Sequence, residues 1–283
     1  MKFEFCSKNI KELEADFELV FVQDKKLGDF KDAKAFFELN EYKGEGLCLD
    51  LAKKRLFIGL KSLDYEDLRL AFFNAYKSLC KLNVKSIKTP SVLGECVMMS
   101  FSSLVQGFLF GAYGFDKYKA EKKTPKIAKI LISSQELNGK KFNISEAKLG
   151  LELGEILGSA TNFTKDIVNE IPFTYTPLKM AEDALNLAKK DKNIKCKIYD
   201  EKFLEKEKMN AFLAVNRASI HPPRLIHLSY KPKNAKKRVV FVGKGLTYDS
   251  GGLSLKPSDY MLTMKADKSG AAAAMGIIKA VSE

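Results

Sequence analysis

Short apolar runs alternate with longer segments of helical periodicity through the first half of the 283-residue sequence. Asp64–Leu82 places apolar residues on one helical face, and Ser100–Tyr113 is predicted as a second helix in which Gly107 and Gly111 allow close packing. The apolar runs have the length and composition of strands, and they are DFELVFVQ, GLCLDL, RLFIGL, SIKTPSV and KIAKILISS. This alternation predicts a small α/β domain over residues 1–134.

A long helical pattern over Ser145–Asn169 follows this domain. It ends before Pro172, because the residue that precedes a proline avoids the helical region. We therefore predict a connecting helix within residues 135–170. Thr176 and Pro177 then have the pattern of a helix N-cap followed by proline at the first helical position, in a second domain over residues 171–283.

The second domain also reads as alternating strands and helices, which favours a parallel or mixed sheet with helices on its faces. Its predicted strands are KCKIYD, FLAVNRA, RLIHLSY and RVVFVG, and its last element is an alanine-rich helix over Ser269–Glu283. A domain of roughly 110 residues with so few strands is small for covering that helix. We therefore expect the sequence to be part of a longer protein.

The composition excludes several classes of protein. The amino terminus has no apolar segment of a signal peptide, and the apolar runs are too short to span a membrane. The five cysteines form no CxxC pair, which is typical of a cytoplasmic protein. The net charge of +13 leaves nucleic-acid binding open, but lysines spread along the whole chain favour a simple role in solubility.

Lys244 follows the apolar run Arg238–Gly243, which predicts a buried strand. Ligands bind at the carboxyl ends of strands in open α/β sheets, so the lysine is a candidate site residue. Partial burial there would lower the pKa of its amine, and a neutral amine can coordinate a metal. The alternative is a lysine whose apolar stem leaves the strand end and whose amine reaches solvent.

Three further charged residues follow at short intervals. Asp249 precedes a Ser-Gly-Gly turn, and its carboxylate is either a metal ligand or part of an ordinary Asx turn. Lys256 precedes a proline, which restricts its backbone and predicts a positioned cation able to stabilise an oxyanion. Asp267 stands at the start of the alanine-rich helix, where its carboxylate can be the N-cap, a metal ligand or both. The spacing fits neither a phosphate-binding P-loop nor a G-x-S-x-G nucleophile elbow.

Oxygen and nitrogen donors without histidine suit Mg²⁺, Mn²⁺ or Zn²⁺. The stretch VGKGLTYDSGGLSLKPSDYMLTMKADKSGAAAA resembles the signature of the cytosolic leucyl aminopeptidases, two-metal peptidases of the M17 type. TKDIVNEIPFTYTPLKMAE and HPPRLIHLSY resemble other parts of their catalytic domain. The implied fold is a small α/β domain joined by a long helix to a mixed-sheet, zinc-peptidase-like α/β catalytic domain that is incomplete here.

The resemblance implies a metal-dependent aminopeptidase that releases amino-terminal residues, with a leucine-type preference, by attack of a hydroxide activated by two metals. Lys244 and Asp267 look like ligands of the more exchangeable metal, and Asp249 like a ligand shared by both. Lys256 looks like the catalytic cation, and Met264 like part of the pocket for the substrate's first side chain, with core packing as the alternative. The cofactors would be two divalent ions, manganese or zinc, with magnesium or cobalt possible.

The resemblance also implies partners. These are peptide substrates and a cytoplasmic homo-hexamer without a membrane association. A DNA-binding regulatory role through the basic surface is the alternative function.

The sequence departs from the family pattern twice. The second signature, NTDAEGRL, is absent, so an aspartate, a glutamate and an arginine of the site are missing and the activity of this segment alone is in doubt. Lys268 stands after Asp267, where the pattern usually has methionine. The sequence offers no explanation for a second positive charge at a helix amino terminus.

Overall fold

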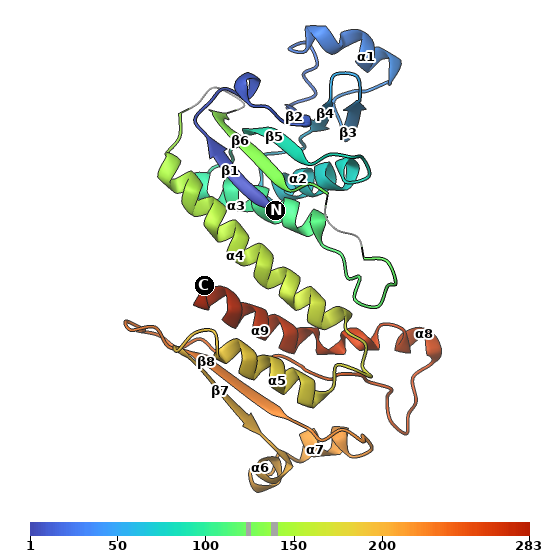
Figure 1. Cartoon of the computed structure of the whole chain (residues 1–283). Coiled ribbons are helices and arrows are strands. Elements are labelled where there is room, and N and C mark those ends of the chain that lie inside the picture. Colours follow the sequence, from blue (N-terminus) through green and yellow to red (C-terminus); the bar gives the residue numbers. More distant parts are fainter. Residues whose placement is uncertain (123–125, 137–140) are drawn as a thin grey trace. The chain divides into compact units, whose positions relative to one another are not determined.

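The computed structural model of the chain describes residues 1–122, 126–136 and 141–283. The chain divides into two compact units, Met1–Gly158 and Ser159–Glu283. The predicted α/β class is confirmed (Figure 1). The division falls inside the long helix α4 (Ile144–Asn169), whereas we predicted domain limits at residues 134 and 170.

The described residues of the first unit form a six-stranded sheet in the order β1-β6-β5-β2-β4-β3. Neighbouring strands are parallel except β3 and β4, which are antiparallel. The strands are β1 (Lys2–Cys6), β2 (Phe17–Val22), β3 (Leu47–Asp50), β4 (Arg55–Gly59), β5 (Ser86–Ser91) and β6 (Lys129–Glu136). Only β1 was missed by the sequence analysis, since its alternating charged and apolar residues have a partly buried pattern and its partner β6 lies far away in the sequence.

Helices pack on this sheet and on one another. Asp64 caps α2 by accepting a hydrogen bond from the Glu66 amide at 2.8 Å. An added Cβ at Gly107 would lie 2.5 Å from the Arg69 carbonyl oxygen, so the predicted close packing of α3 is confirmed. The helical elements before α4 are η1 (Ile10–Glu12), η2 (Lys31–Ala33), α1 (Lys34–Leu39), α2 (Tyr65–Leu79) and α3 (Val97–Ala112).

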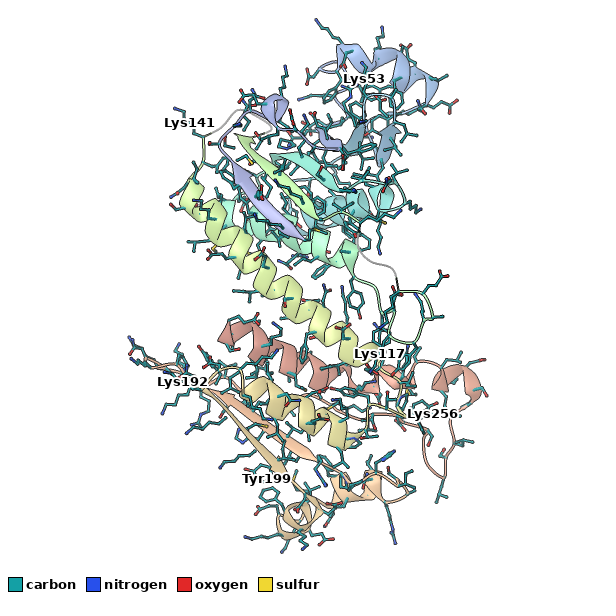
Figure 2. The ribbon with its side chains drawn as sticks, in the orientation of Figure 1. Lys53, Lys117, Lys141, Lys192, Tyr199 and Lys256 are labelled. Carbon is teal, nitrogen blue, oxygen red and sulfur yellow. The ribbon has the colours of Figure 1, made fainter. Side chains whose placement is uncertain are left out.

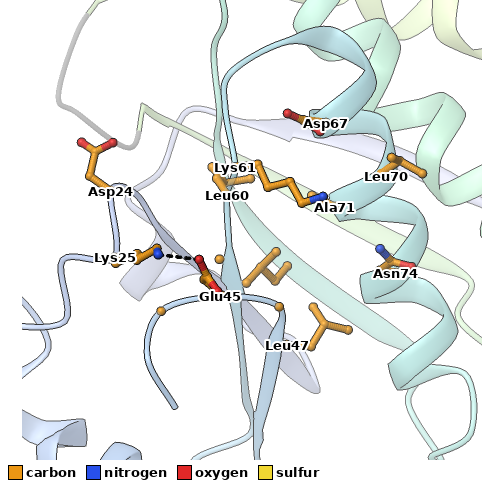
Figure 3. A pocket seen from close by; sticks show the side chains of 14 residues that line it. Asp24, Lys25, Glu45, Leu47, Leu60, Lys61, Asp67, Leu70, Ala71 and Asn74 are labelled. Carbon is orange, nitrogen blue, oxygen red and sulfur yellow. Dashed lines mark ion pairs between the residues drawn. The ribbon is translucent and has the colours of Figure 1, made fainter.

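A pocket of about 490 Å³ lies in the first unit, beside the loops that follow β2 and β4 (Figure 3). Its lining includes the ion pair between Lys25 and Glu45, at 2.6 Å, and exposed apolar side chains such as Leu47 and Leu70. None of the predicted site residues is among its lining residues. This pocket is therefore separate from the charged stretch that the sequence analysis singled out.

The second unit begins with the last part of α4 and contains a two-stranded antiparallel sheet. Thr176 caps α5 by accepting a hydrogen bond from the Lys179 amide at 3.3 Å, which confirms the predicted helix start. The elements after α4 are α5 (Pro177–Ala188), β7 (Ile194–Tyr199), α6 (Glu201–Lys206), α7 (Asn210–Asn216), β8 (Leu225–Tyr230), α8 (Ser258–Met261), η3 (Met264–Lys268) and α9 (Ser269–Ser282).

Two strand predictions in this unit are wrong. FLAVNRA lies largely in helix α7, where the apolar residues Phe212 and Val215 have helical spacing. Arg238–Gly243 has no regular secondary structure, and Val242 is 96% exposed rather than buried. Within the described residues no strand pairs with this segment, so its apolar side chains have no sheet surface to cover. The sheet of this unit is accordingly antiparallel, whereas we expected a parallel or mixed one.

The core of the second unit joins the end of α4 to α5 and α9. Its buried residues are Ile167, Tyr175, Met180, Ala184, Ala272 and Met275. An added Cβ at Gly276 would lie 2.2 Å from Thr164 Oγ1, so α9 approaches α4 very closely. In the described part of the chain no helix is long and apolar enough to cross a membrane.

Candidate active site

The backbone at Gly243 and Lys244 packs directly against the first turn of α9. An added Cβ at Gly243 would lie 2.3 Å from the Gly270 carbonyl oxygen, and one at Gly270 would lie 2.7 Å from the Lys244 amide nitrogen. The Ala271 amide donates a hydrogen bond to the Lys244 carbonyl at 2.9 Å. Two glycines therefore permit a backbone contact that holds Lys244 beside the residues preceding α9.

Lys244 and Asp267 form an ion pair, although they are 23 positions apart. The lysine Nζ lies 2.8 Å from each carboxylate oxygen and donates its hydrogen bond to Oδ1. Asp267 Oδ2 is buried and accepts no hydrogen bond. The structure thus brings the two predicted ligands together, with both carboxylate oxygens in contact with the Lys244 ammonium.

Two expectations about this pair are wrong. Asp267 lies within η3 and is not the N-cap of α9, because Lys268 occupies that position and the carboxylate faces Lys244 instead. The hydrogen bond to Asp267 raises the pKa of Lys244, and 57% of its side chain stays exposed to solvent. Burial is too slight to outweigh the carboxylate, so Lys244 is an ammonium here.

Asp249 joins the Ser-Gly-Gly turn to Lys256. Its Oδ1 accepts a hydrogen bond from the Gly251 amide at 2.8 Å, and its Oδ2 accepts one from Lys256 Nζ at 2.9 Å. Gly251 has a φ of +90°, and the Lys256 amide donates to the Ser250 carbonyl at 2.9 Å, which turns the chain back. The hydrogen bond from Lys256, followed by that from Gly251, lowers the pKa of Asp249. The Asx turn and a ligand role are compatible.

Lys256 also contacts Met264, so the predicted catalytic cation touches the predicted substrate-pocket residue. Lys256 lies on the loop that leads into α8 (Figure 2), and its Nζ is 3.2 Å from Met264 Sδ. The Met264 side chain is partly buried at the start of η3.

The donor set fits part of a divalent metal site. Asp267 and Asp249 offer carboxylate oxygens, and the Lys244 nitrogen offers a further hard donor. Among the described residues no three His, Cys, Asp or Glu side chains converge as a metal cluster. These residues would therefore supply only part of a coordination shell. Because ligands bind metals without their protons, Lys244 would have to lose one to coordinate.

Lys268 is a buried charge whose surroundings the sequence analysis did not explain. Its exposure is 0%, its Nζ donates to the carbonyls of Glu170 and Lys265, and it lies 5.7 Å from the centre of the Tyr175 ring. Burial lowers the pKa of Lys268 to about 8, assisted by Lys265 and opposed by the charge of Glu170. The only indication of this in the sequence was that a lysine stands where the family pattern usually has methionine.

Comparison with known proteins extends this description. The family described as "Cytosol aminopeptidase family, catalytic domain" matches residues 162–283. A probable cytosol aminopeptidase of Campylobacter jejuni is 73% identical over 283 residues, which are 100% of this chain and 59% of that protein. One of Wolinella succinogenes is 39% identical over 280 residues, covering 98% of this chain and 58% of that protein. The chain thus spans less than two thirds of the length of these curated relatives.

Solved structures share the fold. A tomato leucine aminopeptidase mutant aligns with a TM-score of 0.81 and 21% identity, over 100% of this chain and 59% of that one. The bottromycin maturation enzyme BotP in complex with Mn aligns with a TM-score of 0.76 and 23% identity, over 95% of this chain and 56% of that one. The charged stretch lies within the part of the chain that matches the catalytic domain of the cytosol aminopeptidase family, and the whole chain aligns with curated probable cytosol aminopeptidases.

Proposed function

We propose that this chain carries part of the active site of a metal-dependent aminopeptidase. The observation that carries the proposal is the cluster in which Lys244 pairs with Asp267 and Lys256 pairs with Asp249. Four charged residues at separate positions converge in the unit that the family matches. Two lysines and two aspartates have no net charge together, and the two carboxylates offer oxygens to a cation.

Lys244, Asp249 and Asp267 would hold the metals. Two divalent ions, when bound, would supply polarisation of the scissile carbonyl and activation of the attacking water. Manganese and zinc are our first candidates, because carboxylate and nitrogen donors suit both and the BotP relative of the fold was solved with Mn. The ion pair of Asp267 with Lys244, the other residue assigned to the same metal, supports its assignment as a ligand.

Lys256 would stabilise the negative charge that develops on the carbonyl oxygen. Its ammonium is held by Asp249 on one side and Met264 on the other, and its side chain is 27% exposed. A positioned cation in a partly desolvated site stabilises an oxyanion more than a mobile surface lysine does. Met264 would contact the first side chain of the substrate, which accounts for the leucine-type preference that we propose.

The test uses the polypeptide extended to the length of the curated relatives, since this chain spans 59% of the Campylobacter protein. We expect it to hydrolyse leucine p-nitroanilide with added Mn²⁺ or Zn²⁺ and to lose that activity in EDTA. Asp249→Asn should reduce turnover by two or more orders of magnitude, because it removes a metal ligand and the carboxylate that pairs with Lys256. Asp259→Asn is the matched control, because Asp259 is an exposed aspartate on the adjoining helix α8.

Activity that survives EDTA, or equal losses in both variants, would contradict the proposal. The homo-hexamer and the DNA-binding alternative stay predictions. Sedimentation of the full-length polypeptide tests the first. The second predicts a DNA affinity that falls steeply as salt rises, because bound lysines would release counterions from the phosphates.

A further inference from the structure

We propose that Lys268 is a positioning residue that fixes η3, and with it the carboxylate of Asp267, to the end of helix α4. This inference rests on the proposed function of the site. It is based on the buried ammonium of Lys268, which donates hydrogen bonds to backbone carbonyls of two separate segments of the chain.

The first segment is the carboxyl end of α4. Lys268 Nζ lies 2.9 Å from the Glu170 carbonyl oxygen and 3.4 Å from that of Val168. The last carbonyls of a helix lack partners within the helix, and they carry the negative end of its dipole. A lysine donates to such carbonyls favourably. Here the donor comes from a position almost 100 residues away, so it joins distant parts of the second unit.

The second segment is η3 itself. Lys268 Nζ also donates to the Lys265 carbonyl, three residues earlier. This bond joins the last residue of η3 back to its second residue. The centre of the Tyr175 ring lies 5.7 Å from the Lys268 Nζ. Asp267 lies inside this closed turn, between the bonded carbonyl of Lys265 and the anchored side chain of Lys268. Moving the turn would therefore move the carboxylate.

A buried cation contributes little net stability compared with a packed apolar residue, because its desolvation is costly. Its specific effect is on geometry. An apolar side chain at this position would leave the carbonyls of Val168, Glu170 and Lys265 without this donor, and the turn would lose the bonds that Lys268 makes to the end of α4. Metal affinity depends on such supporting contacts around the ligands, and their removal commonly weakens it about 10–100-fold.

The experiment measures Mn²⁺ binding calorimetrically on the full-length polypeptide, well below the unfolding temperature of each variant. The variants are Lys268→Met, Lys268→Gln and Lys268→Arg. The matched control is Lys279→Met, because Lys279 is another buried lysine of α9, and it pairs with Glu283 rather than with the η3 turn. The electron spin resonance spectrum of bound Mn²⁺ gives a second readout of ligand geometry.

We expect Lys268→Met to raise the Kd for Mn²⁺ about tenfold and to broaden the spectrum. Lys268→Arg should restore most of the affinity, and Lys279→Met should bind as the wild type does. If Lys268→Met does not fold, Lys268→Gln takes its place, with a smaller rise expected because its amide can still donate. Unchanged Mn²⁺ affinity with a lower Tm would overturn the inference alone, as would an equal loss in Lys279→Met. A wild type that binds no Mn²⁺ would overturn the proposed function as well.

Discussion

The Nζ atom of Lys256 lies 3.2 Å from the Sδ atom of Met264, at the point where the loop before α8 meets the start of η3. The two residues were singled out for different roles, one as the cation at the scissile carbonyl and the other as part of the pocket for the substrate side chain. Their contact means that a substrate's carbonyl and first side chain would be recognised by neighbouring atoms. Changes at either residue should therefore separate into effects on turnover and effects on selectivity.

Replacement of Lys256 by alanine tests the turnover effect. We expect kcat of the full-length polypeptide for leucine p-nitroanilide to fall about 100–1000-fold, because a donor to the developing oxyanion is lost. KM should change little, since the interaction strengthens only in the transition state. Steady-state kinetics measure both values. Lys236→Ala, at an exposed lysine, is the control, and a Lys256→Ala enzyme with wild-type kcat would exclude the assigned role.

Replacement of Met264 by alanine tests the selectivity effect. Shortening this side chain removes apolar contact with a leucine side chain but not with alanine, so the preference for leucine should fall about tenfold. The measurement compares kcat/KM for leucine and alanine p-nitroanilides. Met264→Leu keeps the volume and loses the sulfur, so it should preserve the preference. An unchanged ratio in Met264→Ala would place the substrate side chain elsewhere.

The sequence predicted the periodic parts of this fold and the charged cluster's members. Strands such as β2 and β4 and the long helix α4 follow from their own apolar patterns. Arg238–Gly243 did not follow, because an apolar run becomes a strand only when a neighbour pairs with its backbone. The Lys244–Asp267 contact was implied by resemblance, whereas the fully exposed Val242 beside it was not foreseen.

The partners of the charged side chains were harder to predict. The pKa of Lys244 depends on a carboxylate 23 positions away, which no local pattern indicates. Lys268 looks like a surface cation in sequence, yet its acceptors are backbone carbonyls, which have no sequence signature of their own. The resemblance identified Lys268 as a departure from the family pattern. The structure was needed to show which groups accept hydrogen bonds from its side chain.

Replacement of Gly243 by alanine tests the backbone contact that holds the site together. The added Cβ would lie 2.3 Å from the Gly270 carbonyl oxygen, so the two segments must separate. We expect a loss of roughly 1–3 kcal/mol in the free energy of unfolding, together with weaker Mn²⁺ binding. Gly28→Ala is the control, because its Cβ would meet no atom within 4 Å. Full stability and affinity in Gly243→Ala would show that the contact does not position Lys244.

Asp16 provides a test of stability in the first unit as a function of pH. Its carboxylate accepts hydrogen bonds from the amides of Lys85 at 2.7 Å and Ser86 at 2.9 Å, which joins the start of β2 to the start of β5. These bonds, that from Lys85 first, lower the pKa of Asp16. Folding therefore favours the ionised form. Its contribution is fully present above the ordinary pKa of an aspartate, about 3.9, and is lost as the pH falls through the lower pKa of the folded state.

Asp16→Asn should accordingly lower the free energy of unfolding at pH 7 by about 1 kcal/mol, because an amide oxygen is a weaker acceptor for the two N–H groups. The difference between wild type and variant should shrink as the pH is lowered below about 4, where Asp16 of the unfolded wild type takes up a proton before the folded form does. Thermal unfolding of the 283-residue chain across this range measures the effect. Asp29→Asn, at an exposed aspartate of the same unit, should show no such difference at any pH. A gap between wild type and Asp16→Asn that stays constant down to pH 3 would mean that the charge of Asp16 is not what joins the two strands.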